Sequence, residues 1–350
     1  MPLLARMLAA PLVVDVRPGA LAGLGALLAD HRIATEGRVA IAVGPGQGHT
    51  ITADLLVGAP AVFRVSDGSH DSAATLGREL RAGAYEAVAG IGGGKTIDVT
   101  KFAAHMAGIP MVAVATSLSH DGIASPVSSL EHESGKGSYG VASPVAVVVD
   151  LDRVRAAPGL LSCAGVGDVV ANLSAVADWE LSAADTGEPL DGLAVAMART
   201  AAQAVILQPG RERSDQFLTV LAEALILSGM AMAVAGSSRP GSGGDHEIMH
   251  AIDQLYPGTA SHGELAGLGA LFCAYLREDD EQFAAISSCL SRHGLPRGPA
   301  DVGLSQPDFA RAVGHAPATR PGRYTILECL ALSGAQIAKR VEEYVLAIPG

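Results

Sequence analysis

The chain has 350 residues, which is more than one ordinary hydrophobic core requires and suits two domains. Its formal net charge of −12 argues against nucleic acid as a partner, because binding a phosphate backbone needs clustered Lys and Arg. The four cysteines are scattered without a CxxC pair, which argues against a disulfide framework and a thiolate zinc site. The apolar run at the start is short and Arg6 interrupts it, and no stretch reaches the roughly 20 apolar residues of a membrane span. We therefore expect a cytoplasmic protein with no membrane span.

The first 150 residues alternate short β-branched runs with helical patterns. Helices are expected over Ser72–Ala82 and Asp98–Met106, and strands over Val39–Val43, Ala61–Val65, Ala87–Ile91, Met111–Ala115 and Ala146–Asp150. Strands separated by helices predict an open parallel sheet with right-handed crossovers, a Rossmann-like α/β domain. Ligands of such sheets bind beyond the carboxyl ends of the strands, so the turns at those ends should face one crevice.

Beyond about residue 155 the strand signals nearly vanish and Ala- and Leu-rich helical patterns take over. The expected helices are Gly167–Ser182, Asp191–Val205, Phe217–Ala235, Asp245–Leu255, Glu264–Leu276 and Tyr324–Ala347. The pattern predicts an α/β domain over residues 1–155 and an all-α domain over residues 156–350.

A glycine-rich turn, Gly92-Gly93-Gly94-Lys95-Thr96, follows one predicted strand and opens a helix. Three consecutive glycines allow a pyrophosphate to approach the backbone, and the helix adds N–H donors and the positive end of its dipole. The turn matches neither GxGxxG nor the P-loop, so a plain glycine-rich turn stays the alternative. A second polar turn, Thr116–Gly122, follows the next strand. Two such turns on adjacent strands predict a cofactor crevice.

A third turn, Gly44-Pro45-Gly46-Gln47-Gly48, follows the strand Val39–Val43, and Asp67 follows the strand after it. An acid at that distance can hold an adenosine ribose and disfavour a 2′-phosphate, which favours NAD over NADP. A solvated loop aspartate is the alternative.

The helical half carries the strongest chemical pattern. His246 and His250 are four residues apart on one helix face, and His262 opens the next helical run. Asp168, in Gly165-Val166-Gly167-Asp168, is expected to open another helix. One Asp and two His from three helices match a catalytic metal site with open positions. Histidines that only decorate a helix surface or core are the alternative.

The segment His246-Glu247-Ile248-Met249-His250 also satisfies HExxH, which predicts a zinc protease with Glu247 as the base. A glycine-rich nucleotide domain has no purpose in a protease, so this alternative is disfavoured.

Six stretches together resemble the sn-glycerol-1-phosphate dehydrogenase family, within the group of iron-type alcohol dehydrogenases, glycerol dehydrogenases and dehydroquinate synthases. They run in order from about residue 90 to residue 330: GIGGGKTIDVTKFAA, IPMVAVATSLSHDGIASP, GVGDVVANLSAVADWEL, SSRPGSGGDHEIMHAID, SHGELAGLGAL and RYTIL. The resemblance implies a dehydroquinate synthase-like fold and an NAD(P)- and metal-dependent interconversion of dihydroxyacetone phosphate and sn-glycerol 1-phosphate in phospholipid metabolism. It further implies a homo-oligomer.

The resemblance assigns roles to individual residues. Asp168, His246 and His262 would hold the metal, usually zinc, although two His and one Asp also suit nickel or iron. His250 and Asp121 would be catalytic and would bind the substrate together with Asp168, which retires the HExxH pattern. The cofactor would be bound by Gly92, Gly93, Gly94, Lys95, Thr96, Thr116, Ser117, Leu118, Ser119 and Ser125.

Several alternatives stay open. Gly244-Asp245-His246 stands where the family more often has Ser-Glu-His, and GPGQG replaces a more usual Gly-Pro-Asn. These departures leave room for another metal-dependent polyol dehydrogenase, for a specialised biosynthetic paralogue, and for a non-catalytic nucleotide-binding homologue. Asp121 has helix capping as its alternative role. Arg239 and Lys136 are candidates for the substrate phosphate, with solvated surface charges as the alternative.

Overall fold

The structure, a computed structural model, describes residues 10–30, 32–35, 37–48, 50–51, 61–133, 135–209 and 214–349. They fall into two compact units. The first unit is Met1–Gly159 with Arg213–Gly236, and the second is Leu160–Glu212 with Ser237–Gly350. The helix α8 (Asp215–Ala235) thus groups with the first unit, whereas the division expected at residue 155 assigns it to the second domain.

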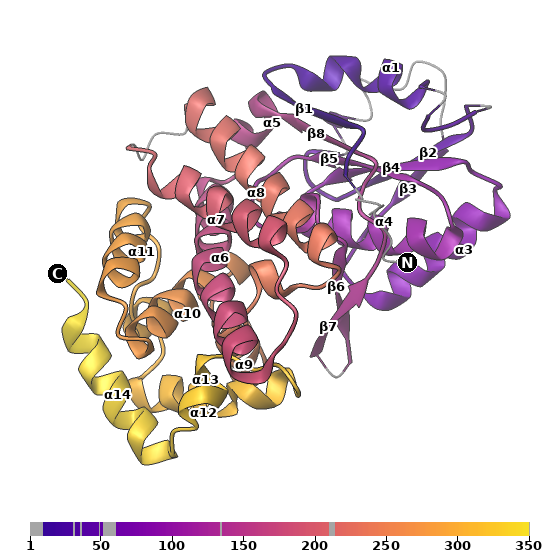
Figure 1. The fold of residues 1–350 in the computed structure, drawn as a ribbon. Helices are drawn as coiled ribbons and strands as arrows, with labels where there is room; N and C mark the ends of the chain where they lie inside the picture. The colour runs from indigo at the N-terminus through magenta and orange to yellow at the C-terminus, as the bar shows by residue number, and fades with distance from the viewer. Residues whose placement is uncertain are drawn as a thin grey trace, which may run out of the picture. The chain divides into compact units, whose positions relative to one another are not determined.

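A six-stranded, fully parallel sheet forms the centre of the first unit (Figure 1). Its order is β1-β8-β5-β4-β2-β3. The strands are β1 (Val13–Arg17), β2 (Val39–Val43), β3 (Ala61–Arg64), β4 (Ala87–Gly92), β5 (Met111–Ala115) and β8 (Ala146–Asp150). The expected open parallel α/β sheet is therefore confirmed.

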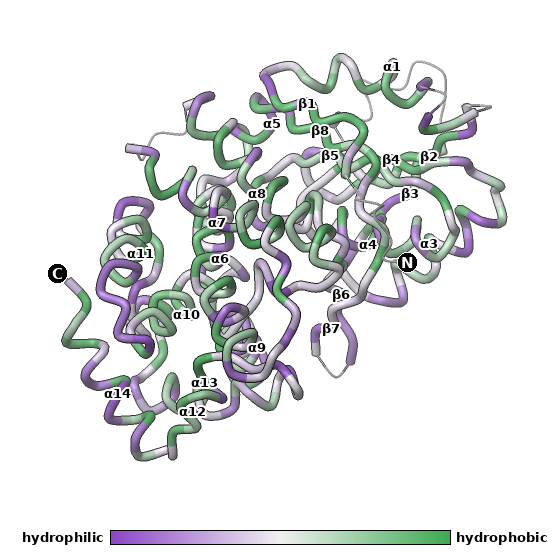
Figure 2. The backbone as a smooth tube through the Cα atoms, viewed as in Figure 1, coloured by the Kyte–Doolittle hydropathy of each residue, from purple (hydrophilic) through white to green (hydrophobic). Residues whose placement is uncertain are grey.

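The four central strands are buried at every residue, because both faces of the sheet are covered. Such strands consist of continuous apolar runs rather than alternating ones, and β2 and β4 are accordingly green in Figure 2. One face packs on the 3-10 turn η1 (Ala20–Gly23) and α1 (Leu24–Leu28), where Leu24 joins the cluster of Ile41 and Val148.

The opposite face carries α3 (His70–Ala82) and α4 (Gly94–Ala107), which lie side by side (Figure 1). Gly90 allows α4 to come close, since a Cβ at this position would lie 2.9 Å from Cβ of Thr100. The first unit also contains α5 (Leu151–Ala156), the 3-10 turn η2 (Asp121–Ile123) and an antiparallel pair of strands, β6 (Val127–His132) and β7 (Gly135–Gly140). The strands expected from sequence did not include β6 or β7.

The order of the strands reverses between β2 and β4, since β3 lies outside β2 and β4 lies on its other side. Open α/β sheets bind ligands at such a switch point. The turns after β2 and β4 meet there: the amide of Gly44 donates to the carbonyl oxygen of Ile91 at 3.1 Å, and a Cβ on Gly44 would collide with Thr96. The glycine turns singled out in the sequence thus adjoin one another.

The second unit is helical, and none of its described residues forms a strand. Its helices are α6 (Gly159–Thr186), α7 (Gly192–Ile206), α9 (Gly244–Leu255), α10 (His262–Leu276), α11 (Asp280–Arg292), α12 (Gln306–Thr319), α13 (Ile326–Leu330) and α14 (Gly334–Ala347), with the 3-10 turns η3 (Arg239–Gly241) and η4 (Pro299–Val302). The expected helical second region is confirmed.

Two expectations about these helices are wrong. Asp168 does not open a helix but lies well inside the 28-residue α6. The single helix expected over Tyr324–Ala347 is two helices, because α13 ends where Ala331 adopts a left-handed conformation with φ 44°. Thr325 starts α13 instead, since its hydroxyl accepts from the amide of Leu327 at 3.1 Å.

Two helices among the described residues, α6 and α8, are long and apolar enough to cross a membrane by length and composition. Neither helix is an unbroken apolar run, because each contains a few polar residues within its apolar stretch. Of their most apolar windows, 72% and 67% of residues are buried inside the protein. A helix that is apolar on all sides is typical of a buried core helix, so this finding is weak evidence for a membrane.

In the second unit, α6 and α10 approach each other so closely that only glycine fits at the contact. A Cβ on Gly167 would collide with the carbonyl oxygen of Gly263, and a Cβ on Gly263 would collide with that of Ala164. Both obstacles are backbone atoms, which cannot rotate away. This contact sets Asp168, the residue after Gly167, beside His262, the residue before Gly263.

We predict that Gly263→Ala destabilises the protein by about 1–3 kcal/mol, as expected for overpacking at a site that cannot relax. The matched control is Gly334→Ala, at the first residue of α14, where nothing lies within 4 Å of an added Cβ. That change should be neutral or stabilising by up to about 1 kcal/mol. Thermal unfolding of both variants measures the difference, and equal midpoints would contradict the close contact.

Candidate functional site

Three side chains from three helices converge in the second unit: Asp168 of α6, His246 of α9 and His262 of α10. One ligand atom of each lies within 4.8 Å of the other two. Nε2 of His262 is 3.3 Å from Oδ1 of Asp168 and 3.2 Å from Nε2 of His246, which itself is 3.8 Å from the same carboxylate oxygen. Asp168 and His246 are buried, whereas the side chain of His262 is 34% exposed and keeps the cluster accessible. The structure thus brings together the three residues that the sequence analysis selected as metal ligands.

Asp245 fixes the orientation of His246. Its Oδ1 contacts Nδ1 of His246 at 2.5 Å, and Asp245 is fully buried. A carboxylate on one ring nitrogen sets the tautomer and aims the other nitrogen, which is the usual support of a metal-binding histidine. This role of Asp245 is not predictable from the sequence, where it is only a departure from Ser-Glu-His, because adjacency in sequence does not reveal which way an aspartate points.

His262 is positioned by the start of α10. The carboxylate of Glu264 accepts from the amide of Ser261 at 2.8 Å and from its hydroxyl at 2.5 Å, which closes a capping box around the first turn. His262 therefore becomes the first residue of the helix, two residues before the start expected from sequence. The pattern Ser-x-x-Glu is a signal that the sequence reasoning overlooked.

His250 lies one turn beyond His246 on α9 and outside the cluster. The two ring centroids are 6.5 Å apart, and Nε2 of His250 is 2.9 Å from Nη2 of Arg320. The ligand group among the described residues contains His262 and Asp168 in place of His250. The HExxH arrangement is therefore not formed.

Glu247 is fully buried within α9. Its Oε2 accepts from the hydroxyl of Thr325 at 3.2 Å. Burial, together with the nearby carboxylates of Glu328 and Asp178, raises the pKa of Glu247 to about 9. A carboxyl group that keeps its proton at neutral pH cannot serve as the base of a protease.

In the first unit, the candidate cofactor residues form one surface at the ends of β4 and β5. The amide of Thr116 donates to the carbonyl oxygen of Gly92 at 3.0 Å. A Cβ on Gly93 would lie 3.2 Å from Oγ of Ser117, and one on Gly94 would collide with His120. No side chain caps α4, whose N-cap is Gly93. Most of the selected side chains are buried or line this turn: Thr96, Thr116, Ser117, Leu118 and Ser125 are buried, and Ser119 is half-buried.

Lys95 is the exception among the candidate cofactor residues. Its ammonium group pairs with Oε1 of Glu131 at 2.8 Å, and its side chain is 72% exposed. Asp67 is also exposed, and its carboxylate accepts from the amide and hydroxyl of Ser69 at 2.9 and 2.6 Å. These hydrogen bonds hold the pKa of Asp67 well below its usual range, so it is an anion. Its contact with a ribose stays a prediction.

Lys101 is a residue that sequence reasoning missed. It is fully buried, and its ammonium group donates to the carbonyl oxygens of Gly122 and Ser125 at 2.6 and 3.1 Å. Oδ1 of Asp98 lies 3.3 Å away. Burial lowers the pKa of Lys101, and Asp98 opposes that shift. A lysine on an amphipathic helix reads as a surface residue, so nothing in the sequence indicated that Lys101 holds the SHDGIAS loop in place.

Asp121 in that loop is held by α8. Its Oδ2 accepts from the hydroxyl of Ser228 at 2.8 Å, and Gly229 lets the helix approach the backbone of Ser125. The alternative capping role of Asp121 is wrong, because the cap of η2 is His120, whose Nδ1 accepts from the amide of Gly122 at 3.0 Å. The carboxylate of Asp121 is therefore oriented by tertiary packing.

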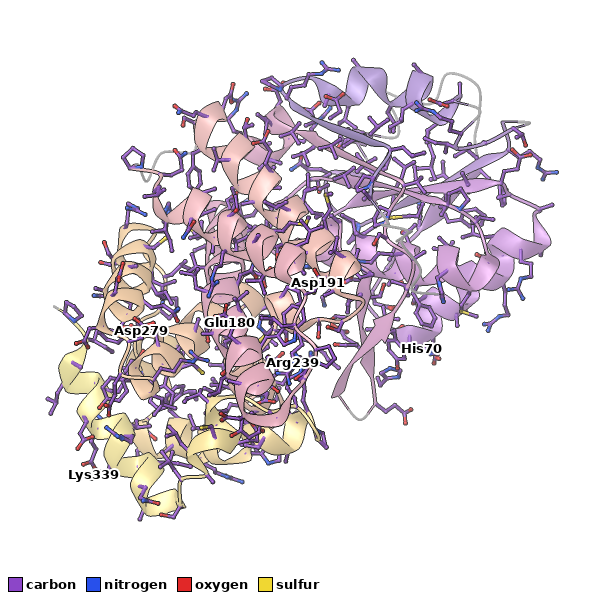
Figure 3. All side chains as sticks on the ribbon, in the orientation of Figure 1. His70, Glu180, Asp191, Arg239, Asp279 and Lys339 are labelled. Carbon is purple, nitrogen blue, oxygen red and sulfur yellow. The ribbon has the colours of Figure 1, made fainter. Side chains whose placement is uncertain are left out.

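Arg239 is not a solvated charge. It is buried, and its side chain lies among the helices of the second unit in Figure 3. Its guanidinium group binds both carboxylate oxygens of Glu188, at 2.9 and 2.5 Å, and donates to the carbonyl oxygen of Tyr324 at 2.8 Å. These bonds tie the guanidinium group to an acid and a carbonyl group within the helical unit, which favours a structural role for Arg239 over binding of a phosphate. Lys136 lies on the exposed strand β7 of the first unit.

Comparison with known proteins identifies the family. Residues 15–158 match the family model of the iron-containing alcohol dehydrogenases. The glycerol-1-phosphate dehydrogenase [NAD(P)+] of Thermofilum pendens is 42% identical over 251 residues, which cover 71% of this chain and 72% of that one. The enzyme of the same name from Methanothrix thermoacetophila is 33% identical over 326 residues and 88% of both chains. The chain belongs to the glycerol-1-phosphate dehydrogenase family.

Solved structures support the fold of this family member. A probable glycerol dehydrogenase from Sinorhizobium meliloti matches with a TM-score of 0.78 over 97% of this chain and 98% of that chain, at 21% identity. Glycerol dehydrogenase from Schizosaccharomyces pombe matches with a TM-score of 0.72 over 97% and 90% of the two chains, at 19% identity. At these identities the likeness concerns the fold alone.

We predict that Lys101→Met lowers the free energy of unfolding by about 3–5 kcal/mol, because it leaves Asp98 and two carbonyl groups buried without a partner. The control is Lys95→Met, which removes another Lys–acid pair on α4 but an exposed one, and should cost less than about 1 kcal/mol. Denaturant unfolding measures both values. If Lys101→Met lowers the free energy of unfolding as little as Lys95→Met does, the buried ammonium group of Lys101 does not hold the loop.

Proposed function

We propose that the protein interconverts dihydroxyacetone phosphate and sn-glycerol 1-phosphate with NAD(P) and one divalent metal ion. The observation that carries this proposal is the cluster of Asp168, His246 and His262 within 4.8 Å in a member of this family. The chain supplies a ligand set for a metal in the second unit and a glycine-rich nucleotide turn in the first unit.

The three residues fit a divalent metal. Two imidazoles and one carboxylate form a donor set with room for further ligands, and the contact with Asp245 leaves Nε2 of His246 directed at the cluster. A bound ion would supply Lewis acidity that polarises a carbonyl group and stabilises negative charge on its oxygen. We favour zinc, although the same donors suit nickel or iron.

Gly92, Gly93, Gly94 and Thr96 fit the pyrophosphate of a dinucleotide, because side chains at the glycines would fill the space beside Thr96, Ser117 and His120. The nicotinamide cofactor supplies the redox chemistry when bound. Thr116, Ser117, Leu118, Ser119 and Ser125 would line its path. Lys95 would have to leave Glu131 to reach a phosphate, since the two now form an ion pair.

His250 is the residue that we assign to proton transfer. A guanidinium group can only donate, so Nε2 of His250 accepts from Arg320 and the proton of the neutral ring is on Nδ1. Histidine changes its protonation near neutral pH. To act as the donor, the ring would be released by Arg320 and protonated on Nε2, and the resulting cation would give its Nδ1 proton to the substrate oxygen and return to the neutral form. Asp121, an acceptor fixed by Ser228, would orient the substrate hydroxyl groups. The cytoplasmic location, the pathway and the homo-oligomeric state stay predictions from the sequence.

Removal of the metal should abolish activity. We expect protein treated with a chelator to lose reduction of dihydroxyacetone phosphate by NADH and NADPH, and stoichiometric zinc to restore it, because the polarisation of the carbonyl is lost with the ion. Metal content measured on the same samples is the control. Full activity of metal-free protein would contradict the mechanism.

Single histidine variants separate the ligands from the substrate contact. His246→Ala and His262→Ala should each lose bound metal, whereas His250→Ala should keep it and lose about 10²–10⁴-fold in kcat, the usual contribution of a positioned acid or base. The matched control is His315→Ala, because His315 contacts Gln254 and is not part of the metal cluster. This variant should change neither the metal content nor kcat. Loss of metal from the His250 variant would instead support the HExxH arrangement, in which His246 and His250 both bind the metal.

A further inference from the structure

Two arginines follow α12 and have no part in the metal cluster or the cofactor turns. Arg320 donates from Nη1 to Oγ of Ser238 at 3.2 Å and from Nη2 to Nε2 of His250 at 2.9 Å. Arg323 donates from Nη2 to the same hydroxyl at 2.9 Å and from Nη1 to the carbonyl oxygen of Ser242. Both residues are half-buried, so a ligand can reach them.

The partners of these two arginines are all neutral. Over the part of the chain that the structure describes, no carboxylate oxygen lies within ion-pair distance of Arg320 or Arg323. Two other arginines of this unit differ, since Arg239 binds Glu188 and Arg277 binds Asp178. Two guanidinium groups are thus held on one hydroxyl without a carboxylate in contact, and Glu247 and Asp245 act on them only from a longer distance.

This arrangement is unfavourable in the free protein. Burial and the neighbouring charges of Arg320 and Arg239 lower the pKa of Arg323 to about 10, in that order of size. Like charges that are held together and partly desolvated are stabilised by an anion between them. The free energy that their repulsion costs is recovered when such an anion binds.

The two arginines adjoin the reactive part of the site. Arg320 contacts His250, whose ring centroid lies 6.5 Å from that of the metal-cluster residue His246. Ser238 lies in the segment SSRPGSGG, which leads directly into α9. Arg323 opens the stretch RYTIL, which belongs to the family pattern and has no role in the mechanism derived above.

We propose that Arg320 and Arg323, together with the hydroxyl of Ser238, bind the phosphate of the substrate. This inference rests on the proposed function, which makes the substrate a phosphorylated three-carbon ketone or alcohol. The planar guanidinium fork matches phosphate oxygens, and two such groups balance the charge of about −2 that a phosphate monoester carries. Ser238 accepts from both arginines, which leaves its own hydroxyl proton to donate.

The consequence is that this site selects phosphorylated over unphosphorylated polyols. The metal cluster, His250 and the arginines all lie in the second unit, so this unit alone would hold both the reacting carbon and the phosphate of the substrate. Arg239 is paired with Glu188 and would not contact the phosphate of the substrate.

Arg323→Gln is the sharpest test, because Arg323 does not touch His250. We expect the KM for dihydroxyacetone phosphate to rise about ten-fold or more, since a charge-assisted pair of hydrogen bonds is lost. The kcat/KM for dihydroxyacetone, which lacks the phosphate, should stay unchanged. The control is Arg340→Gln. Arg340 lies on α14 and pairs with Glu278, and the variant should leave the kinetics with both substrates unchanged. An equal loss on both substrates, or no loss on either, would overturn the inference.

Binding of inorganic phosphate gives a second measurement that does not depend on turnover. Calorimetric titration of metal-free protein should detect phosphate binding in the unmodified chain and in Arg340→Gln, but not in Arg323→Gln. If Arg323→Gln fails to fold, Arg323→Lys keeps the charge without the fork and should bind phosphate more weakly than the unmodified chain.

The two measurements separate this inference from the proposed function. Unmodified protein that binds phosphate through Arg323 but does not reduce dihydroxyacetone phosphate would refute the function and keep the anion site. Turnover of dihydroxyacetone phosphate with an unchanged KM in Arg323→Gln would keep the function and refute the site.

Discussion

Gly167 and Gly263 bring the backbones of α6 and α10 so close that a methyl group on either would meet a carbonyl oxygen. The neighbouring residues, Asp168 and His262, consequently face each other at 3.3 Å across the helix contact. Side chains that must converge on one ion need rigid supports, and two helices in backbone contact provide them better than loops. The third member, His246, comes from α9, which packs on α10 and is aimed by Asp245. The geometry of the cluster therefore depends on the absence of two side chains.

Charge is arranged differently at the two ends of this helical site. Beneath the cluster lie buried acids, among them Asp245 and Asp178. Burial raises the pKa of Asp178, the pairing with Arg277 opposes that shift, and its Oδ2 accepts from the amide of Gly244 at 2.7 Å. Beyond His250, the charges are those of Arg320 and Arg323, which have no carboxylate in ion-pair contact among the described residues. A cation is favoured at the acidic end and an anion at the basic end, with one neutral imidazole between them. This gradient suits a substrate with a carbonyl group at one end and a phosphate at the other.

The features that could be predicted from sequence are local ones. Buried strands are continuous apolar runs, so five of the six strands of the sheet were bounded within one residue, and β6 and β7 were missed because Ser and Gly interrupt their pattern. Asp168, His246 and His262 were found because their residue types are those of a metal site. Lys101, Ser228 and Arg239 could not be assigned, since their roles depend on partners 21, 107 and 51 residues away in sequence. Position within a helical pattern does not show which side of the helix is buried.

Chemistry and substrate selection are carried by separate residues that share one contact. The cluster and His250 act on the carbon that changes oxidation state, whereas Arg323 touches neither and can only sense what is attached further along the substrate. Arg320 belongs to both sets, because one of its nitrogens donates to His250 and another to Ser238. An anion bound at the arginines would compete with His250 for the N–H groups of Arg320, and Nε2 of His250 would become free to take up a proton. Through this link the phosphate can prepare the proton donor as well as anchor the substrate, so binding energy from a non-reacting group contributes to the reaction itself.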